Sequence, residues 1–276
     1  MNVCKIPKVI HYCWFGGNPF PPLALKCIES WKKYCPDYVI KEWNENNFDI
    51  NFNAYTEEAY DAQKWAFVSD VARLYSVYTD GGVYLDTDVE IIKPIDEILG
   101  NSMFVGFETD KEILINTGLG FGAEKNFHIV KKMLDIYDNI SFIKPDGTFD
   151  LTPCPMYNTE IIKNEGFIIN NTKQTINNVT VYPTEYFCPK AIRTNKLKIS
   201  KNTYTIHHYA SSWWSDEIHQ GYRRKQRYEK IFGQKIGSYM YSADYIYQKR
   251  GIRGVLTKIK EKMIGQRQGE GHEQNT

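Results

Sequence analysis

The sequence predicts an α/β fold, in which a mixed, mostly parallel sheet is flanked by helices. Three observations indicate it. The chain has 276 residues, enough for one large α/β domain with elaborations or for two small domains. Its composition, 42% hydrophobic and 24% charged, is that of an ordinary globular protein. Apolar, strand-like runs alternate with helix-like segments along the first half of the chain, which is typical of a parallel sheet.

The first elements follow the order strand, helix, strand. Residues 8–15 (KVIHYCWF) form an apolar run, and residues 21–36 have the apolar spacing of a helix. Pro22 suits the first turn of that helix and Pro36 ends it. Residues 38–43 (YVIKEW) read as a second strand. This order predicts the start of a parallel sheet.

A second helix is expected to begin at Thr56, as N-cap, and to run to about Tyr78. Gly81 and Gly82 then stop it and turn the chain into a strand at 83–86. The apolar stripe of this helix comprises Phe67, Val71, Leu74 and Tyr78.

The second half of the chain is predicted from weaker patterns. A strand is expected at 104–108, a helix near 126–139 and a loop at 144–155. Further strands are expected at 178–187 and 203–210. We therefore predict a main α/β domain at 1–215, a basic helical extension at 216–267 and a disordered tail at 268–276.

Charge and cysteine content narrow the class of protein. The net charge is +1, so bulk charge does not indicate nucleic-acid binding. The six cysteines include no C-x-x-C pair, and their spacings fit neither a zinc site nor a small disulfide framework. The N-terminus lacks the apolar core of a signal peptide, and no stretch of 18 apolar residues occurs. A cytoplasmic protein with free thiols is expected.

The stretch 81–90, GGVYLDTDVE, is the first candidate site. If the strand continues through it, Asp86 and Asp88 point to the same face. Two carboxylates on one face repel each other, and burial adds a cost that a divalent cation removes. The alternative is a strand end in open water, where two carboxylates cost little. By itself, a D-x-D is a weak signal.

The helix before this strand carries a second candidate pair. Asp70 and Arg73 are three residues apart and therefore share a helix face. A surface ion pair is the simpler interpretation. Because the helix runs directly into the D-x-D, the pair could instead bind ligand hydroxyls beside a metal.

Two further groups are candidates at strand ends. Trp14 lies at the carboxyl end of the first strand, where α/β sheets bind nucleotides, although a core tryptophan is the commoner case. His11 is expected to be a core or hydrogen-bonding histidine. In HHYASSWW, one of His207 and His208 must face the cleft if the strand is half-buried, and imidazole is a good ligand for Mn²⁺ beside carboxylates. Ser211 and Trp213 could reach a diphosphate.

Three blocks together resemble the D-x-D sugar-binding glycosyltransferases of family 32, which are related to the glucosyltransferase domain of large clostridial toxins. The blocks are IPKVIHYCWFGG, SDVARLYSVYTDGGVYLDTDVE and HHYASSW. The resemblance covers roughly residues 5 to 215, and its central block has seven constrained positions at fixed spacing. It implies a GT-A-type fold, a UDP- or GDP-sugar donor, Mn²⁺ or Mg²⁺, and retention at the anomeric carbon.

The resemblance also implies roles for individual residues. Trp14 would stack on the base, Asp70 and Arg73 would hold the donor sugar, and Tyr84 would lie beside the nucleoside. Asp86 and Asp88 would hold ribose and metal. The other implied donor-site residues are Asn116, Ser211 and Trp213, and alignments leave open whether His207 or His208 is the third metal ligand.

The function expected from these observations is metal-dependent, retaining transfer of a hexose to a saccharide or lipid-linked saccharide acceptor, in bacterial polysaccharide, capsule or glycolipid synthesis. No pair of carboxylates is placed as in double-displacement glycosidases, which favours front-face substitution. A toxin-type protein-modifying transferase, a metal-dependent phosphohydrolase and a non-catalytic sugar-binding module are the alternatives. A phosphohydrolase would release inorganic phosphate, which sugar transfer does not. A sugar-binding module would show no metal-dependent turnover of the donor.

The C-terminal region has a separate charge pattern. Residues 221–267 contain thirteen Lys and Arg against three acidic residues. Residues 239–247 (YMYSADYIY) are rich in the aromatic residues that settle at membrane interfaces, and 254–265 have a basic amphipathic pattern. Peripheral contact with the inner face of the cell membrane is therefore expected. A solvated basic face that caps the catalytic domain is the alternative.

Overall fold

The computed structural model describes residues 4–109, 112–192, 194–210, 216–233, 236–248, 251 and 253. The chain divides into two compact units, Met1–Trp213 and Trp214–Thr276. The tail expected at 268–276 and the amphipathic segment expected at 254–265 lie outside the described residues.

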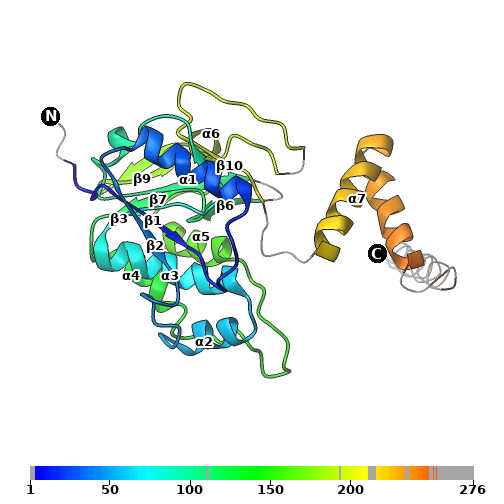
Figure 1. Ribbon diagram of the computed structural model, residues 1–276. Helices are drawn as coiled ribbons and strands as arrows, with labels where there is room; N and C mark the ends of the chain where they lie inside the picture. Colours follow the sequence, from blue (N-terminus) through cyan, green and yellow to red (C-terminus); the bar gives the residue numbers. More distant parts are fainter. Residues whose placement is uncertain are drawn as a thin grey trace, which may run out of the picture. The chain divides into compact units, whose positions relative to one another are not determined.

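An eight-stranded mixed sheet forms the centre of the first unit (Figure 1). Its strands β1, β2, β3, β5 and β9 run in one direction, while β6, β7 and β8 are antiparallel to their neighbours. The order is β2-β1-β3-β7-β5-β9-β8, with β6 beside β5. The predicted mixed, mostly parallel sheet flanked by helices is confirmed. Its strands are β1 (Val9–Cys13), β2 (Val39–Trp43), β3 (Gly82–Tyr84), β5 (Met103–Thr109), β6 (Ile113–Asn116), β7 (Phe121–Ala123), β8 (Gln174–Ile176) and β9 (Val179–Tyr182).

Helices cover both faces of this sheet, and each face has its own apolar core. Val83 belongs to the core that also contains Cys27 and Trp31 of α1, whereas the next residue, Tyr84, belongs to the core of the opposite face. Successive side chains of β3 thus point to opposite faces of the sheet and contribute to both cores. The α1 face also carries the 3₁₀ turn η1, and the other face is covered by four helices. The helices are α1 (Pro22–Tyr34), α2 (Ala54–Asp61), α3 (Trp65–Asp80), η1 (Asp96–Ile98), α4 (His128–Asp135), α5 (Cys154–Asn164) and α6 (Thr184–Phe187).

The helix predicted from Thr56 to Tyr78 is two helices, α2 and α3. Asn53, not Thr56, is the N-cap of α2, because its side chain accepts a hydrogen bond from the Thr56 amide. Gln63 adopts φ of 55°, a left-handed conformation that breaks the helix, and α3 starts again at Trp65. The apolar stripe from Phe67 to Tyr78 lies wholly within α3, so it supports that helix but carries no information about residues 56–64.

The turn from α3 into β3 depends on two glycines, as predicted. Gly81 has φ of 69° and Gly82 has φ of 118°. A Cβ on Gly82 would lie 2.7 Å from the Val9 carbonyl oxygen, so only glycine lets β3 pair this closely with β1. The turn directs the chain from a buried helix straight into the strand that leads to Asp86.

Three expectations for the second half need correction. The strand predicted at 178–187 ends at Tyr182, and Pro183 then caps the short helix α6. The strand predicted at 203–210 is three residues long: β10 (Thr205–His207) pairs with β4 (Val89–Ile91) in a separate small sheet. The helix predicted near 126–139 is the shorter α4.

Within the described residues 216–233 and 236–248 of the second unit, two helices pack as an antiparallel hairpin. One is α7 (Asp216–Phe232), and the other spans 236–248. Ser238 donates a hydrogen bond to Glu229, 2.6 Å away, and Arg224 lies 3.9 Å from Asp244. Gly237 permits the close approach, since a Cβ there would lie 2.4 Å from the Glu229 Cα. Among the described residues, no helix is long and apolar enough to cross a membrane.

Candidate metal and donor site

The D-x-D lies in a turn between β3 and β4, not in a continuous strand. The amide of Val89 donates to the carbonyl of Asp86 at 3.0 Å, which closes the turn. The strand alternation expected from the sequence therefore does not apply, and the turn geometry brings Asp86 and Asp88 together instead. The turn follows the carboxyl end of β3, the edge at which α/β sheets bind ligands.

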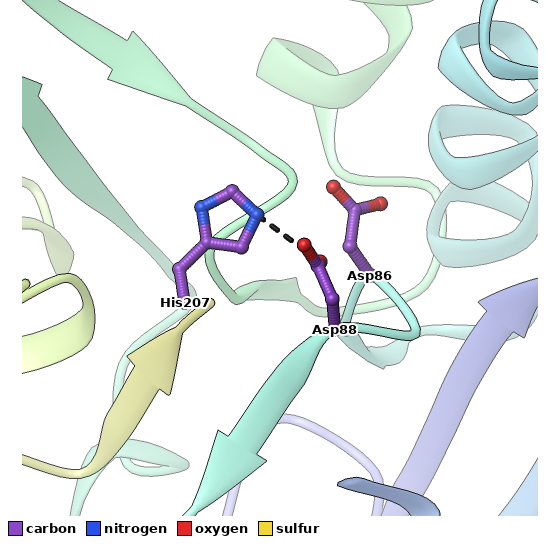
Figure 2. Close-up of side chains that lie close together, drawn as sticks. All are labelled: Asp86, Asp88 and His207. Carbon is purple, nitrogen blue, oxygen red and sulfur yellow. Dashed lines mark ion pairs between the residues drawn. The ribbon is translucent and has the colours of Figure 1, made fainter. Parts of the chain in front are cut away.

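Asp86 and Asp88 meet His207 from β10 at this turn. One ligand atom of each of the three residues lies within 4.8 Å of the others (Figure 2). The His207 Nε2 atom lies 3.1 Å from the Asp88 Oδ1 atom. His208 is directed elsewhere: its Nε2 atom lies 2.8 Å from the Glu90 Oε2 atom. Of the two histidines left open by the sequence, the structure brings His207 to the carboxylates.

The donor set of this cluster fits a divalent cation. Two carboxylates and an imidazole suit Mn²⁺, and carboxylate oxygens suit Mg²⁺. All three side chains are shielded, with 27%, 16% and 10% exposure for Asp86, Asp88 and His207. The buried Nδ1 atom of His207 has no hydrogen-bond partner among the described residues.

The electrostatics of the turn distinguish its two carboxylates. Burial raises the pKa of Asp86, although Arg73 counteracts it. Burial also disfavours the charge of Asp88, but His207 and the amide of Ala210, 2.7 Å from Oδ2, outweigh it and lower the pKa to about 2. The charge of Asp88 conversely overcomes the burial of His207 and raises its pKa to about 9. A metal would therefore displace a proton from His207.

Asp70 and Arg73 form a buried pair, which rules out the surface ion pair. Their side chains are 11% and 7% exposed. The Arg73 Nη2 atom lies 3.1 Å from Asp70 Oδ1 and 3.1 Å from Asp86 Oδ1, so one guanidinium nitrogen bridges helix α3 and the turn. Burial raises the pKa of Asp70 to about 6, although Arg73 opposes the shift. The Arg73 Nε atom has no partner within the described part of the chain.

Asn116 belongs to a hydrogen-bonded group of residues next to Asp86. Its Oδ1 atom accepts from the Gly118 amide at 2.6 Å, and its Nδ2 atom donates to Glu108 at 2.6 Å. The Gly118 carbonyl in turn accepts from the Asp86 amide at 3.1 Å. A Cβ on Gly118 would lie 2.2 Å from Asp86 Oδ2. The backbone at 118 therefore approaches the carboxylate as closely as a glycine permits.

Two residues of the site were not predicted from the sequence. Cys154, the first residue of α5, accepts from Arg73 Nη1 at 3.4 Å, and burial raises the pKa of its thiol well above the usual range. Glu108 lies near the carboxyl end of β5, where its charge helps raise the pKa of His207. Both are far from the D-x-D in sequence. The only local signal was the position of Glu108 near the end of a predicted strand.

The remaining candidates are placed as follows. Trp14 is half-buried and stacks on Phe20, with ring centroids 4.6 Å apart. Tyr84 is buried, donates to Asp86 Oδ1 at 3.0 Å, and its ring centre lies 5.1 Å from the Arg73 guanidinium carbon. His11 is a fully buried, hydrogen-bonded core histidine, as expected. Ser211 and Trp213 lie outside the described residues.

The α/β domain carries a carboxylate–histidine cluster at its strand ends, which could hold a metal ion, and comparison with known proteins narrows the class of protein. Residues 21–105 match the family described as a glycosyltransferase sugar-binding region containing a DXD motif. The match includes Asp70, Arg73, Asp86 and Asp88. The resemblance predicted from the sequence is confirmed for this region.

The chain is also similar to individual proteins. It is 29% identical over 112 residues to inositol phosphoceramide mannosyltransferase 1 of Schizosaccharomyces pombe, which is 37% of this chain and 34% of that protein. The chain thus spans about a third of the length of that relative. The solved PaToxG glycosyltransferase is 20% identical with a TM-score of 0.45, covering 58% of this chain and 70% of that one. A glycosyltransferase involved in glycosylation of the PBCV-1 major capsid is 16% identical with a TM-score of 0.41, covering 74% and 95%.

Proposed function

We propose that this protein is a metal-dependent, retaining glycosyltransferase that moves a hexose from a UDP- or GDP-sugar to a saccharide acceptor, within a GT-A-type domain. The observation that carries the proposal is the bridge of Arg73 between Asp70 and Asp86, next to the Asp86–Asp88–His207 cluster. It joins a candidate sugar-holding pair to a candidate metal site in the region that matches the glycosyltransferase family.

Asp86, Asp88 and His207 would hold Mn²⁺ or Mg²⁺. A divalent cation bound there supplies Lewis-acid stabilisation of the departing diphosphate. Asp70 and Arg73 bind and orient the sugar through its hydroxyls, and their burial excludes water from that side. Trp14 contributes an aromatic face to the base, while Tyr84 fixes Asp86 through its hydroxyl. Ser211 and Trp213 are proposed to contact the diphosphate, on the strength of the sequence resemblance alone.

The proposed chemistry is a front-face substitution at the anomeric carbon. The bond from the acceptor oxygen to that carbon forms on the face from which the bond to the phosphate oxygen breaks, and the acceptor proton passes to the departing phosphate. Arg73 suits this step because two carboxylates hold its guanidinium in place before the substrate arrives. Configuration at the anomeric carbon is retained.

The test is a donor screen followed by product analysis. A panel of UDP- and GDP-sugars with Mn²⁺ should contain one that stabilises the protein, by about 2.7 kcal/mol at a hundredfold excess over Kd. Incubation with that donor should give nucleoside diphosphate and a sugar or glycoside of retained configuration. Release of inorganic phosphate would instead identify a phosphohydrolase. Donor binding without turnover would identify a sugar-binding module.

A further inference from the structure

The end of the C-terminal hairpin exposes large apolar side chains on both of its helices. Ile231 and Phe232, at the end of α7, are 64% and 43% exposed. Ile236 and Met240, at the start of the helix over 236–248, are 60% and 38% exposed. These four residues, the apolar tip, fall within ten positions of the chain. Such a concentration of exposed apolar surface is typical of an interaction site.

A row of exposed cations leads along α7 to this tip. Arg223 and Arg227 are one helical turn apart, and Ile231 follows at the same spacing. Arg223, Arg227 and the adjacent Lys230 are all exposed. The helix therefore presents a basic face that ends in apolar residues.

Two acidic residues of the hairpin, Glu229 and Asp244, are occupied by its own contacts. Glu229 accepts from Ser238 at 2.6 Å and lies 3.7 Å from Lys225. Asp244 lies 3.9 Å from Arg224 and accepts from Gln248. Residues 216–248, which span the hairpin, contain six basic and four acidic residues. The charge left to attract a partner is positive.

We infer that the hairpin docks on an anionic lipid surface, with the apolar tip in the headgroup region and Arg223, Arg227 and Lys230 against the lipid phosphates. A lipid surface accommodates a protruding apolar tip, and its negative charge complements the basic face. A second copy of the chain is disfavoured as the occupant, because it would bring two basic faces together. The inference is independent of the sugar chemistry proposed for the first unit.

The test is sedimentation of the full-length protein with vesicles of phosphatidylcholine alone or mixed with phosphatidylglycerol. The protein should bind only the anionic vesicles, and high salt should release it. The double variant Ile231→Asp/Ile236→Asp should bind at least about tenfold more weakly. Arg227→Glu/Lys230→Glu should lose roughly fivefold or more for each cation. Donor turnover in solution should be unchanged in both variants.

Matched controls lie in the first unit. Ile168 is 66% exposed, and Lys198 is exposed. Ile168→Asp and Lys198→Glu change apolarity and charge to the same extent per residue, and both should bind vesicles like the wild type. If a tip variant fails to fold by circular dichroism, Ile231→Ser/Ile236→Ser replaces it.

A second readout does not depend on loss of binding. Cys4 is the one exposed cysteine of the six. In a Cys4→Ser background, Met240→Cys can therefore carry a polarity-sensitive fluorophore, whose emission should shift to the blue with anionic vesicles. An unchanged emission would overturn the inference, as would full-length protein that ignores anionic vesicles at low salt. Tip variants that change the molar mass in sedimentation but bind vesicles normally would assign the tip to self-association instead.

Discussion

The two halves of the candidate site are built differently. In the turn-borne half, Asp86 and Asp88 of the β3–β4 turn are 27% and 16% exposed, while His207, at the end of β10, is 10% exposed; β10 pairs with β4, which follows the turn. The helix-borne half, Asp70 and Arg73 with Cys154, is buried between α3 and α5. The first half has the openness that an exchangeable ion requires. The second has its charges fixed within the protein interior, so its members should affect folding as well as binding.

The largest effect is expected from Asp88→Ala, in the turn-borne half. Transfer should fall roughly a thousandfold or more, because one charge of the metal site is lost. Metal-dependent donor binding should disappear in calorimetry, while the protein still folds because Asp88 is not part of the core; loss of the ion pair with His207 should lower the thermal midpoint at neutral pH. Near-normal turnover in Mn²⁺ would show that the D-x-D does not hold the metal.

Arg73→Lys, in the helix-borne half, should reduce both the rate of transfer and the stability of the fold. Lysine keeps the charge but has a single nitrogen, which cannot bridge Asp70 and Asp86 and also donate to Cys154, so transfer should fall roughly a hundredfold. The loss of buried hydrogen bonds should also lower the free energy of unfolding by about 1–3 kcal/mol, measured by urea denaturation. This variant should therefore be less stable than the wild type.

Asp70→Asn is the companion to that test. It should reduce the transfer step more than it reduces affinity for the free nucleoside diphosphate, since Asp70 is assigned to the sugar. Equal losses of affinity for the sugar donor and for the diphosphate would remove the pair from the sugar site.

The two adjacent histidines provide a matched pair within the turn-borne half. His207→Ala should weaken activation by Mn²⁺ roughly ten- to a hundredfold. His208→Ala should change it little, because His208 faces Glu90, which retains Lys26 at 2.9 Å. The measurement is the Mn²⁺ concentration for half-maximal turnover. A larger effect at His208 would reverse the assignment drawn from the structure.

The smallest effect is expected from Cys154, which positions Arg73. Cys154→Ala removes an acceptor from a buried guanidinium and should lower kcat about fivefold with little change in nucleotide affinity. Cys154→Ser restores an acceptor and should recover most of the loss. Cys27→Ala is the control, because Cys27 is equally buried but lies in the core on the opposite face of the sheet. If Cys154→Ala behaves like that control, Cys154 only fills space.

The sequence predicted the parts of the fold that depend on local order. The strand–helix–strand start, the glycine turn at Gly81-Gly82 and the adjacency of α3 to the D-x-D all follow from neighbouring residues. The sequence did not show the break at Gln63, because the apolar stripe begins only at Phe67 and glutamine is not a residue that usually ends a helix. Residues 184–187 were expected to form a strand, because aromatic residues favour strands. They form a helix instead, which Pro183 and the packing of Phe187 favour.

The candidate site was predicted in composition but not in geometry. Asp86 and Asp88 were placed together for the wrong reason, since a turn rather than strand alternation unites them. The choice between His207 and His208 depends on how β10 pairs with β4, a long-range contact that no local pattern encodes. Cys154 and Glu108 were missed for the same reason, because only the fold brings α5 and the end of β5 to Arg73 and His207.

The absence of a side chain at Gly118 matters for recognising related sequences that carry a D-x-D. Its Cα faces Asp86 Oδ2 so closely that a methyl group would lie 2.2 Å from that oxygen. A chain that keeps the D-x-D but has alanine at this position should be unable to place the first aspartate correctly. Such a sequence would pass a motif search, yet its first aspartate would have to move from the position in which Arg73 and Tyr84 hold it here. The identity of one residue that carries no functional group can thus decide where the first aspartate of a D-x-D lies.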